Sequence, residues 1–232
     1  MKTNEFLQSW PKLLDSRAPD LMKIDFNIMY PGKEHLLLAK WEIFKEQVLR
    51  FYEANVHNEF CKQLLQQVKS SVSKDVQDYI CAILLNAVMP SSARYKNEHG
   101  KRNRKMTIID AQENFVLQLT SVNDYQRKVN DIINKYYSAG LTLQPFLIVE
   151  GSVETDLKGY YIYFDSILYK LNSFIESLDL CFKIFQIFSL NYPKTCQHPW
   201  LFIQQYFFEI NTIYDFKSPN ITRLVNYLKI NK

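Results

Sequence analysis

Glycine is scarce in this chain, and patterns typical of membrane and secreted proteins are missing. Only 5 of the 232 residues are glycine, whereas aromatic residues make up 15%, a balance that favours a packed helical body over a loop-rich one. No uncharged apolar run reaches about 18 residues, so no segment is predicted to span a membrane. No apolar stretch lies near the N-terminus, so we expect no signal peptide.

Cysteine is also rare. Cys61, Cys81, Cys181 and Cys196 lie far apart, and none belongs to a C-x-x-C pair. This usage is typical of reduced thiols in a cytosolic or nuclear protein. Cys196 and His198 could provide two metal ligands, but no second pair exists, and tetrahedral zinc usually takes four. We therefore predict no metal site and no cofactor.

The stretch from Gln144 to Pro193 organises the predicted fold. The runs at 145–150, 160–164 and 167–171 are apolar, rich in branched and aromatic residues, and separated by polar turns, as strands are. Connections this short predict an antiparallel meander rather than a parallel crossover.

Aromatic helices are predicted after the meander. Ser173 and Glu176 have the spacing of a capping box, which opens a helix over 173–188. Apolar residues occur nearly all round this helix, so we expect it to be buried or to meet a partner. Pro199 opens another aromatic helix, and a last helix is expected near 219–229.

Most of the chain before this stretch is predicted to be helical, because apolar residues recur at three- and four-residue spacing between capping residues and breakers. The predicted helices lie at about 33–55, 58–69, 73–89, 107–119 and 121–139.

The fold class that these segments predict is α+β. We expect a single domain over 1–232, mainly helical, with a helical part at about 33–139. A small antiparallel sheet near 145–171 is expected to pack against aromatic helices within the second part, at about 144–229.

Positive charge is concentrated in one segment. The formal net charge is +4. Six bases and one acid lie between residues 94 and 105, so this segment carries +5 and the rest of the chain −1. This distribution indicates one local basic site rather than a field over the whole surface. The six bases are Arg94, Lys96, Lys101, Arg102, Arg104 and Lys105.

The basic segment has three interpretations. The run KRNRK over 101–105 fits the short basic pattern that nuclear import receptors bind. Lysine and arginine on a loop can also neutralise phosphates without reading base sequence. The third interpretation is a solvated loop that joins two helices, which is common for such charge runs. The sequence leaves all three open.

An enzyme would need clustered carboxylates. Glu150, Asp156 and Lys158 loosely resemble the acid and D-x-K arrangement of metal-dependent nucleases, in which carboxylates hold Mg²⁺ and the lysine supports an attacking water. However, 156–158 is expected to lie in a hairpin turn, where ligands would not be held rigidly. We therefore expect no enzyme activity, and a nuclease is the third candidate function.

Six segments occur in an order that resembles one protein family. They are PGKEHLLLAKW, DYICAILLNAVMPSSARYKN, QPFLIVEG, YYIYFDSILYKL, SLDLCFKIFQIFSLNYP and WLFIQQYFFEI. The chain, from about Trp10 onward, resembles the C-terminal region of uncharacterised, transposon-derived animal proteins that are common in fish and insects. Some of these proteins are described as containing a sterile alpha motif. One departure is Met89, which replaces the first proline of the family's PPSA motif.

The resemblance implies a fold context and no catalytic residues. We therefore expect a non-enzymatic interaction or scaffold domain of a domesticated mobile element, nuclear or cytoplasmic, with an unidentified protein partner. The alternative is a nucleic-acid-binding module that uses the basic loop 94–105.

Overall fold

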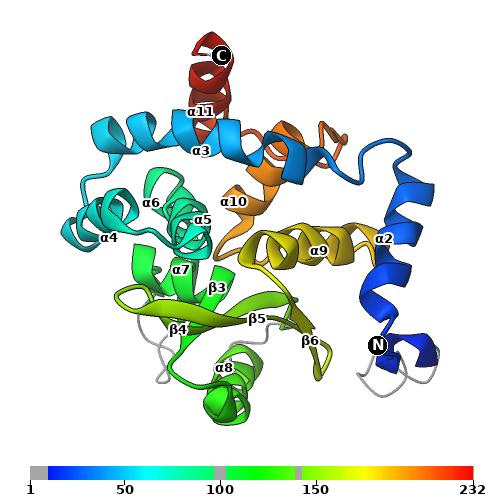
Figure 1. Cartoon of the computed structure of the whole chain (residues 1–232). Coiled ribbons are helices and arrows are strands. Elements are labelled where there is room, and N and C mark those ends of the chain that lie inside the picture. The colour runs from blue at the N-terminus through cyan, green and yellow to red at the C-terminus, as the bar shows by residue number, and fades with distance from the viewer. Residues whose placement is uncertain (1–9, 97–102, 139–142, 232) are drawn as a thin grey trace.

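The computed structural model describes residues 10–96, 103–138 and 143–231, and its centre is a four-stranded sheet with helices on both faces (Figure 1). Helix is the dominant secondary structure, so the predicted mainly helical α+β class is confirmed. None of the helices in these ranges combines the length and the apolar character that crossing a membrane requires.

The predicted meander is confirmed. Strands β4 (Phe146–Ser152), β5 (Asp156–Phe164) and β6 (Ile167–Leu171) pair in antiparallel order. A two-residue turn joins β5 to β6, in which Asp165 and Ser166 have φ of 48° and 70°. Positive φ at both central residues is typical of the turns whose twist matches that of paired strands. This turn therefore sets the register of the second hairpin.

A fourth strand, β3 (Val116–Leu119), lies at the sheet edge and runs parallel to β4. The prediction that the helix beginning after Thr107 continues through these residues is wrong. Helix α7 (Ile108–Phe115) ends before them, and α8 (Tyr125–Ser138) makes the crossover to β4. The edge of β4 offers main-chain hydrogen bonds to an extended segment, and this tertiary pairing overrides the local helical pattern.

The other predicted helices are present, with shifts at their ends, and α2 is a helix that lies outside the predicted segments. The first part of the chain contains η1 (Pro11–Leu14), α2 (Ala18–Met29), α3 (Leu36–Asn55), α4 (Glu59–Ser70), α5 (Lys74–Ile83), α6 (Leu85–Val88) and the short η2 (Val122–Asp124). The second part contains α9 (Phe174–Ile187), α10 (Gln197–Phe202), the π-helical turn η3 (Ile203–Phe207) and α11 (Pro219–Ile230).

Helix α9 lies at the centre of the core. Its Ser173 cap is confirmed, because the hydroxyl accepts from the Glu176 N–H at 3.3 Å. Phe174, Phe182 and Phe185 are each no more than 1% exposed, and the helix packs on the sheet as predicted. Since α9 is buried on every side, its aromatic residues do not form a free surface for a partner.

The sheet separates two apolar clusters. On one face, residues such as Leu147 and Ile162 join the large core that the helical body forms. On the other face, Phe146 and Ile148 pack with Val129 of α8. In Figure 1, α8 accordingly lies on one side of the sheet and α5 and α9 on the other. Both faces are covered, which explains why β4 is apolar along most of its length.

Candidate nucleic-acid interface: a basic hairpin

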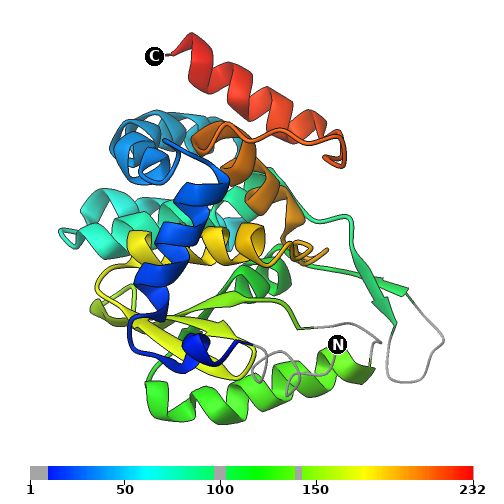
Figure 2. The same cartoon turned by 90° about the vertical axis from the view of Figure 1, so that its right-hand side faces the viewer.

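The two ends of the predicted basic loop form a β-hairpin. Strands β1 (Arg94–Lys96) and β2 (Asn103–Lys105) pair antiparallel, with Arg94 opposite Lys105. The prediction of a loop across 94–105 is therefore wrong for these six residues. We call β1 and β2 the basic hairpin. Figure 2 shows that it stands out from the body of the molecule instead of lying along it.

The base of the basic hairpin is fixed by hydrogen bonds on both strands. The N–H of Met106 donates to the carbonyl of Ala93 at 3.0 Å, which extends the strand pairing by one step. The hydroxyl of Ser91 accepts from the Ala93 N–H at 3.0 Å and donates to the carbonyl of Lys194 at 3.0 Å. Met106 is buried. These contacts set the direction in which the hairpin leaves the body.

Helix α7 begins immediately after the hairpin, with a full capping box. The Thr107 hydroxyl accepts from the Asp110 N–H at 3.1 Å, and the Asp110 carboxylate accepts from the Thr107 N–H at 3.0 Å. The spacing of Thr107 and Asp110 is that of a capping box, so this cap can be recognised in the sequence. The cap ties β2 to a helix of the body, so the second strand is held at its end.

The six predicted site residues are distributed as follows. Arg94 and Lys105 are exposed and lie opposite each other on the two strands. Lys96 belongs to β1 and Arg104 to β2. Lys101 and Arg102 lie outside the described residues. The structure therefore places four of the six predicted residues on two paired strands.

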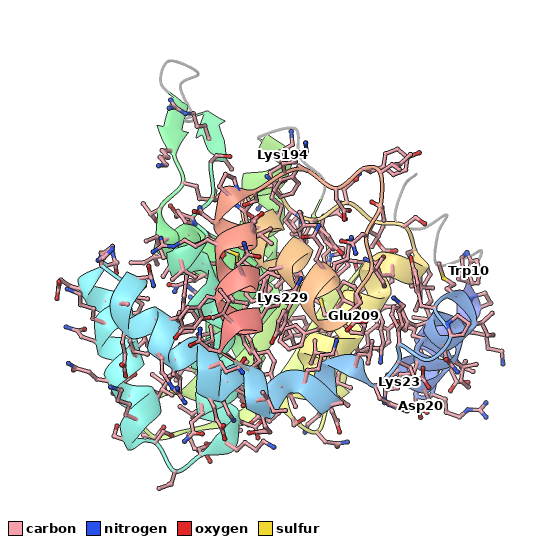
Figure 3. The ribbon with its side chains drawn as sticks, turned by 90° about the horizontal axis from the view of Figure 1, so that it is seen from above. Trp10, Asp20, Lys23, Lys194, Glu209 and Lys229 are labelled. Atoms are coloured by element: carbon pink, nitrogen blue, oxygen red, sulfur yellow. The ribbon has the colours of Figure 1, made fainter. Side chains whose placement is uncertain are left out.

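Two lysines from a distant part of the chain, Lys194 and Lys217, are connected to the base of the hairpin through backbone and ring contacts. The carbonyl of Lys194 is the one that holds Ser91, and Figure 3 shows Lys194 on the same side of the molecule as the hairpin. Lys217 follows Phe216, whose ring packs on His198 at 5.1 Å between centroids. His198 in turn is hydrogen-bonded to the backbone of Pro90, at the entry to the hairpin.

Both of these lysines are exposed. Among the described residues, no ion pair involves Lys194, Lys217, Arg94 or Lys105. Asp215 lies near Lys217 in sequence, but its carboxylate accepts from Thr212, Gln204 and Gln205. Sequence reasoning missed both lysines, because each is isolated in the sequence and only the fold places it beside the hairpin.

His198 is a packing residue at the base of the hairpin. Burial lowers its pKa below the ordinary value, and the hydrogen bond to the Pro90 backbone partly opposes this shift. The neighbouring Cys196 thiol is buried and lies 3.7 Å from the carbonyl of Asn114. Within the part of the chain that the structure describes, no group of three His, Cys, Asp or Glu side chains is placed to hold a metal ion.

The D-x-K residues lie on a strand, which corrects the turn expected from the sequence. Asp156 begins β5, and Lys158 follows where the register between β4 and β5 shifts. The hairpin loop is thus shorter than the polar stretch suggests. The physical reason is that Leu157 is apolar and joins the core, which draws its polar neighbours into the strand.

The two carboxylates of this set have different partners. Glu150 accepts from the hydroxyl of Tyr161 at 3.1 Å, and Tyr161 belongs to the cluster on the α8 face. Asp156 accepts from the hydroxyl of Ser73 at 2.8 Å, at the start of α5. That the protein is not an enzyme stays a prediction.

A groove of about 850 Å³ runs beside β3, between α4, α7 and α8. Its lining mixes charges of both signs, with Lys128 and Lys158 beside Glu113, Asp131 and Glu154. In contrast to the basic hairpin, this groove does not select for a partner of one charge.

Comparison with protein families, with curated proteins and with solved structures found no match to this chain. The function is therefore argued from the geometry of its own residues.

Proposed function

We propose that this chain is a non-enzymatic interaction module and that its basic hairpin contacts nucleic acid. The resemblance to transposon-derived proteins supports an origin in a mobile element, and it brings no catalytic residues. A protein partner is compatible with this role, but no described surface identifies one. The basic hairpin does indicate the chemistry of a partner, because Arg94 and Lys105 are exposed and lie opposite each other on its two strands.

The observation that carries the proposal is a like-charge pair. Arg94 lies directly opposite Lys105 across the hairpin. Like charges at directly opposed positions destabilise a strand pair, and neither side chain has an acidic partner among the described residues. The phosphates of a nucleic acid would neutralise both charges and would remove this repulsion. A solvated connection between β1 and α7 would need no such pair.

The surrounding charge supports the same partner. Lys194 and Lys217 add two exposed cations at the base of the hairpin, while the chain outside 94–105 is slightly acidic overall. Cations gathered on one side steer a polyanion to that side. Contacts of this kind bind phosphates and carry little base specificity by themselves.

The test is binding of a short, fluorescently labelled DNA of mixed sequence, followed by anisotropy between about 50 and 200 mM salt. We expect affinity to fall steeply with salt. In Arg94→Gln/Lys105→Gln, binding should weaken and the slope of log K against log salt should become less negative by about 2, because two phosphate contacts are lost.

The control is Lys12→Gln/Lys23→Gln, which removes the same charge from the exposed Lys12 on η1 and from the half-buried Lys23 on α2, which pairs with Asp20 at 3.3 Å. Figure 3 shows Lys23 on the opposite side of the molecule from the hairpin. This control should keep the affinity and slope of the unmodified protein. Equal losses in the two variants, or no salt-sensitive binding by the unmodified protein, would contradict the proposal.

A further inference from the structure

We infer that the nucleic acid is double-stranded DNA in the B form and that the basic hairpin enters its major groove. The inference rests on the proposed function and narrows it to one class of partner and one mode of contact. It follows from the shape of the hairpin, from the positions that share one of its faces, and from the lysines at its base.

The shape of the hairpin fits one groove. Two paired strands lie about 4.8 Å apart, and with their side chains they fit a major groove about 12 Å wide but not a minor groove about 6 Å wide. The major groove of A-form RNA is deep and narrow, and side chains cannot read it. A ribbon that projects from the body, as in Figure 2, therefore fits B-form DNA better than duplex RNA.

The register of the hairpin gives it two different faces. Arg94 is paired with Lys105, and Lys96 with Asn103. Directly opposed residues share a face of the ribbon, and residues two apart along a strand share it too. These four positions therefore form one face, and three of them are basic. The positions of Tyr95 and Arg104 form the other face.

The lysines at the base are placed to contact the DNA backbone. When a ribbon occupies the major groove, the protein surface around its base meets the phosphates that border the groove. The carbonyl of Lys194 accepts from Ser91 just before the hairpin. Lys217 follows Phe216, whose ring packs on His198, and His198 is hydrogen-bonded to the backbone of Pro90. Both lysines are exposed. In this arrangement the two strands occupy the major groove, and the two lysines face the phosphates along its edges.

Single-stranded nucleic acid fits this surface less well. Proteins that bind single strands track the backbone in a positively charged groove and stack successive bases on aromatic side chains. The groove beside β3 is of mixed charge, and the basic hairpin projects instead of lining a channel. We therefore expect duplex DNA to be preferred over a single strand of the same sequence.

The first experiment compares duplex DNA, duplex RNA and single-stranded DNA of one sequence in the same anisotropy assay. Duplex DNA should bind at least tenfold more tightly than the other two. If all three bind alike and Arg94→Gln/Lys105→Gln weakens all of them, the inference is overturned while the proposed function stands. If none binds with salt sensitivity, the proposed function itself fails.

The second experiment locates the ribbon by methylation protection of the bound duplex. Guanine N7 lies in the major groove and adenine N3 in the minor groove, so dimethyl sulfate reports both. We expect protection at guanine N7 within the site, with adenine N3 still reactive. Protection at adenine N3 alone would overturn the major-groove assignment.

The third experiment tests the lysines at the base. Lys194→Gln/Lys217→Gln should weaken duplex binding by roughly tenfold or more, through lost phosphate contacts, and should leave the guanine N7 protection pattern in place. Lys12→Gln/Lys23→Gln is again the control. An unchanged affinity in the Lys194 and Lys217 variant would show that the ribbon binds without the rim contacts and would overturn this arrangement.

Discussion

At the scale of single residues, a buried charge pair stands out among the contacts of the body. Asp78 is 1% exposed, and its Oδ1 accepts from Lys45 Nζ at 2.6 Å and from Trp41 Nε1 at 2.9 Å. Lys45 also reaches Glu42 at 3.1 Å. Such a pair is weak evidence for stability, because desolvation offsets the attraction, but each partner becomes costly when the other is removed.

We predict that Asp78→Ala lowers the free energy of unfolding by roughly 3 kcal/mol, since it leaves the buried Lys45 ammonium with the exposed Glu42 as its only acidic partner among the described residues. In Lys45→Met/Asp78→Leu neither buried charge remains, and the Trp41 N–H lacks a partner, which costs about 1–3 kcal/mol. Urea unfolding followed by circular dichroism measures both. A double variant less stable than the single one would contradict the role of the buried lysine charge.

At the scale of elements, the basic hairpin carries the proposed binding surface, whereas the body contains the apolar core. Among the described residues, the side-chain and cap contacts that hold the hairpin lie at its base, with Ser91 and Ala93 on one strand and Met106 and the cap of α7 on the other. Changes to its exposed cations therefore leave the contacts of the core in place, so targeting and binding can be tested without loss of the fold.

We predict that alanine at all four basic positions of 101–105 shifts a fluorescent fusion from the nucleus toward the cytoplasm, because the run fits an import signal. Imaging of the fusion in cells measures the shift. The free energy of unfolding should change by no more than about 0.5 kcal/mol, as is usual for surface positions. The substituted residues are Lys101, Arg102, Arg104 and Lys105.

A control with four alanines at exposed basic positions elsewhere should leave the distribution unchanged. Its positions are Lys12, Lys128, Lys170 and Lys229. If both variants keep the distribution of the unmodified fusion, the run 101–105 does not act in targeting, and nucleic-acid contact remains to be judged by binding alone.

At the scale of the whole molecule, one apolar cluster runs from Leu13 to Leu228 and includes residues of the sheet. Phe44 of α3 packs against Phe207 of η3 at 4.9 Å between ring centroids, with an interplanar angle of 76°. Both rings are fully buried. Contacts of this kind join the helical part near 33–139 to the part near 144–229 in one core.

We predict that the chain unfolds in one transition. Circular dichroism reports the helices of both parts, whereas tryptophan fluorescence reports chiefly Trp41 and Trp200, which are each 1% exposed. The two curves should coincide. Phe182→Ala should shift both together, by roughly 3–5 kcal/mol, because it opens a cavity in the shared core. Two separate midpoints would mean that the parts unfold independently.

The sequence by itself determined the features that depend on neighbouring residues. The meander near 145–171, the caps at Ser173 and Thr107 and the burial of α9 follow from local patterns of apolar, polar and turn residues. The concentration of charge in 94–105 was likewise visible, since it needs only counting. These features could be predicted because the residues that make each of them lie close together in the chain.

Tertiary structure alone decided the features that depend on distant partners. Strand β3 forms because the edge of β4 accepts it, against a helical local pattern. The site gained Lys194 and Lys217 because the fold brings them to the base of the hairpin. The fold also gives Glu150 and Asp156 separate hydroxyl partners, Tyr161 and Ser73. Pairing and packing between distant segments carry no local signature, and their free energy outweighs the small intrinsic preferences of the residues involved.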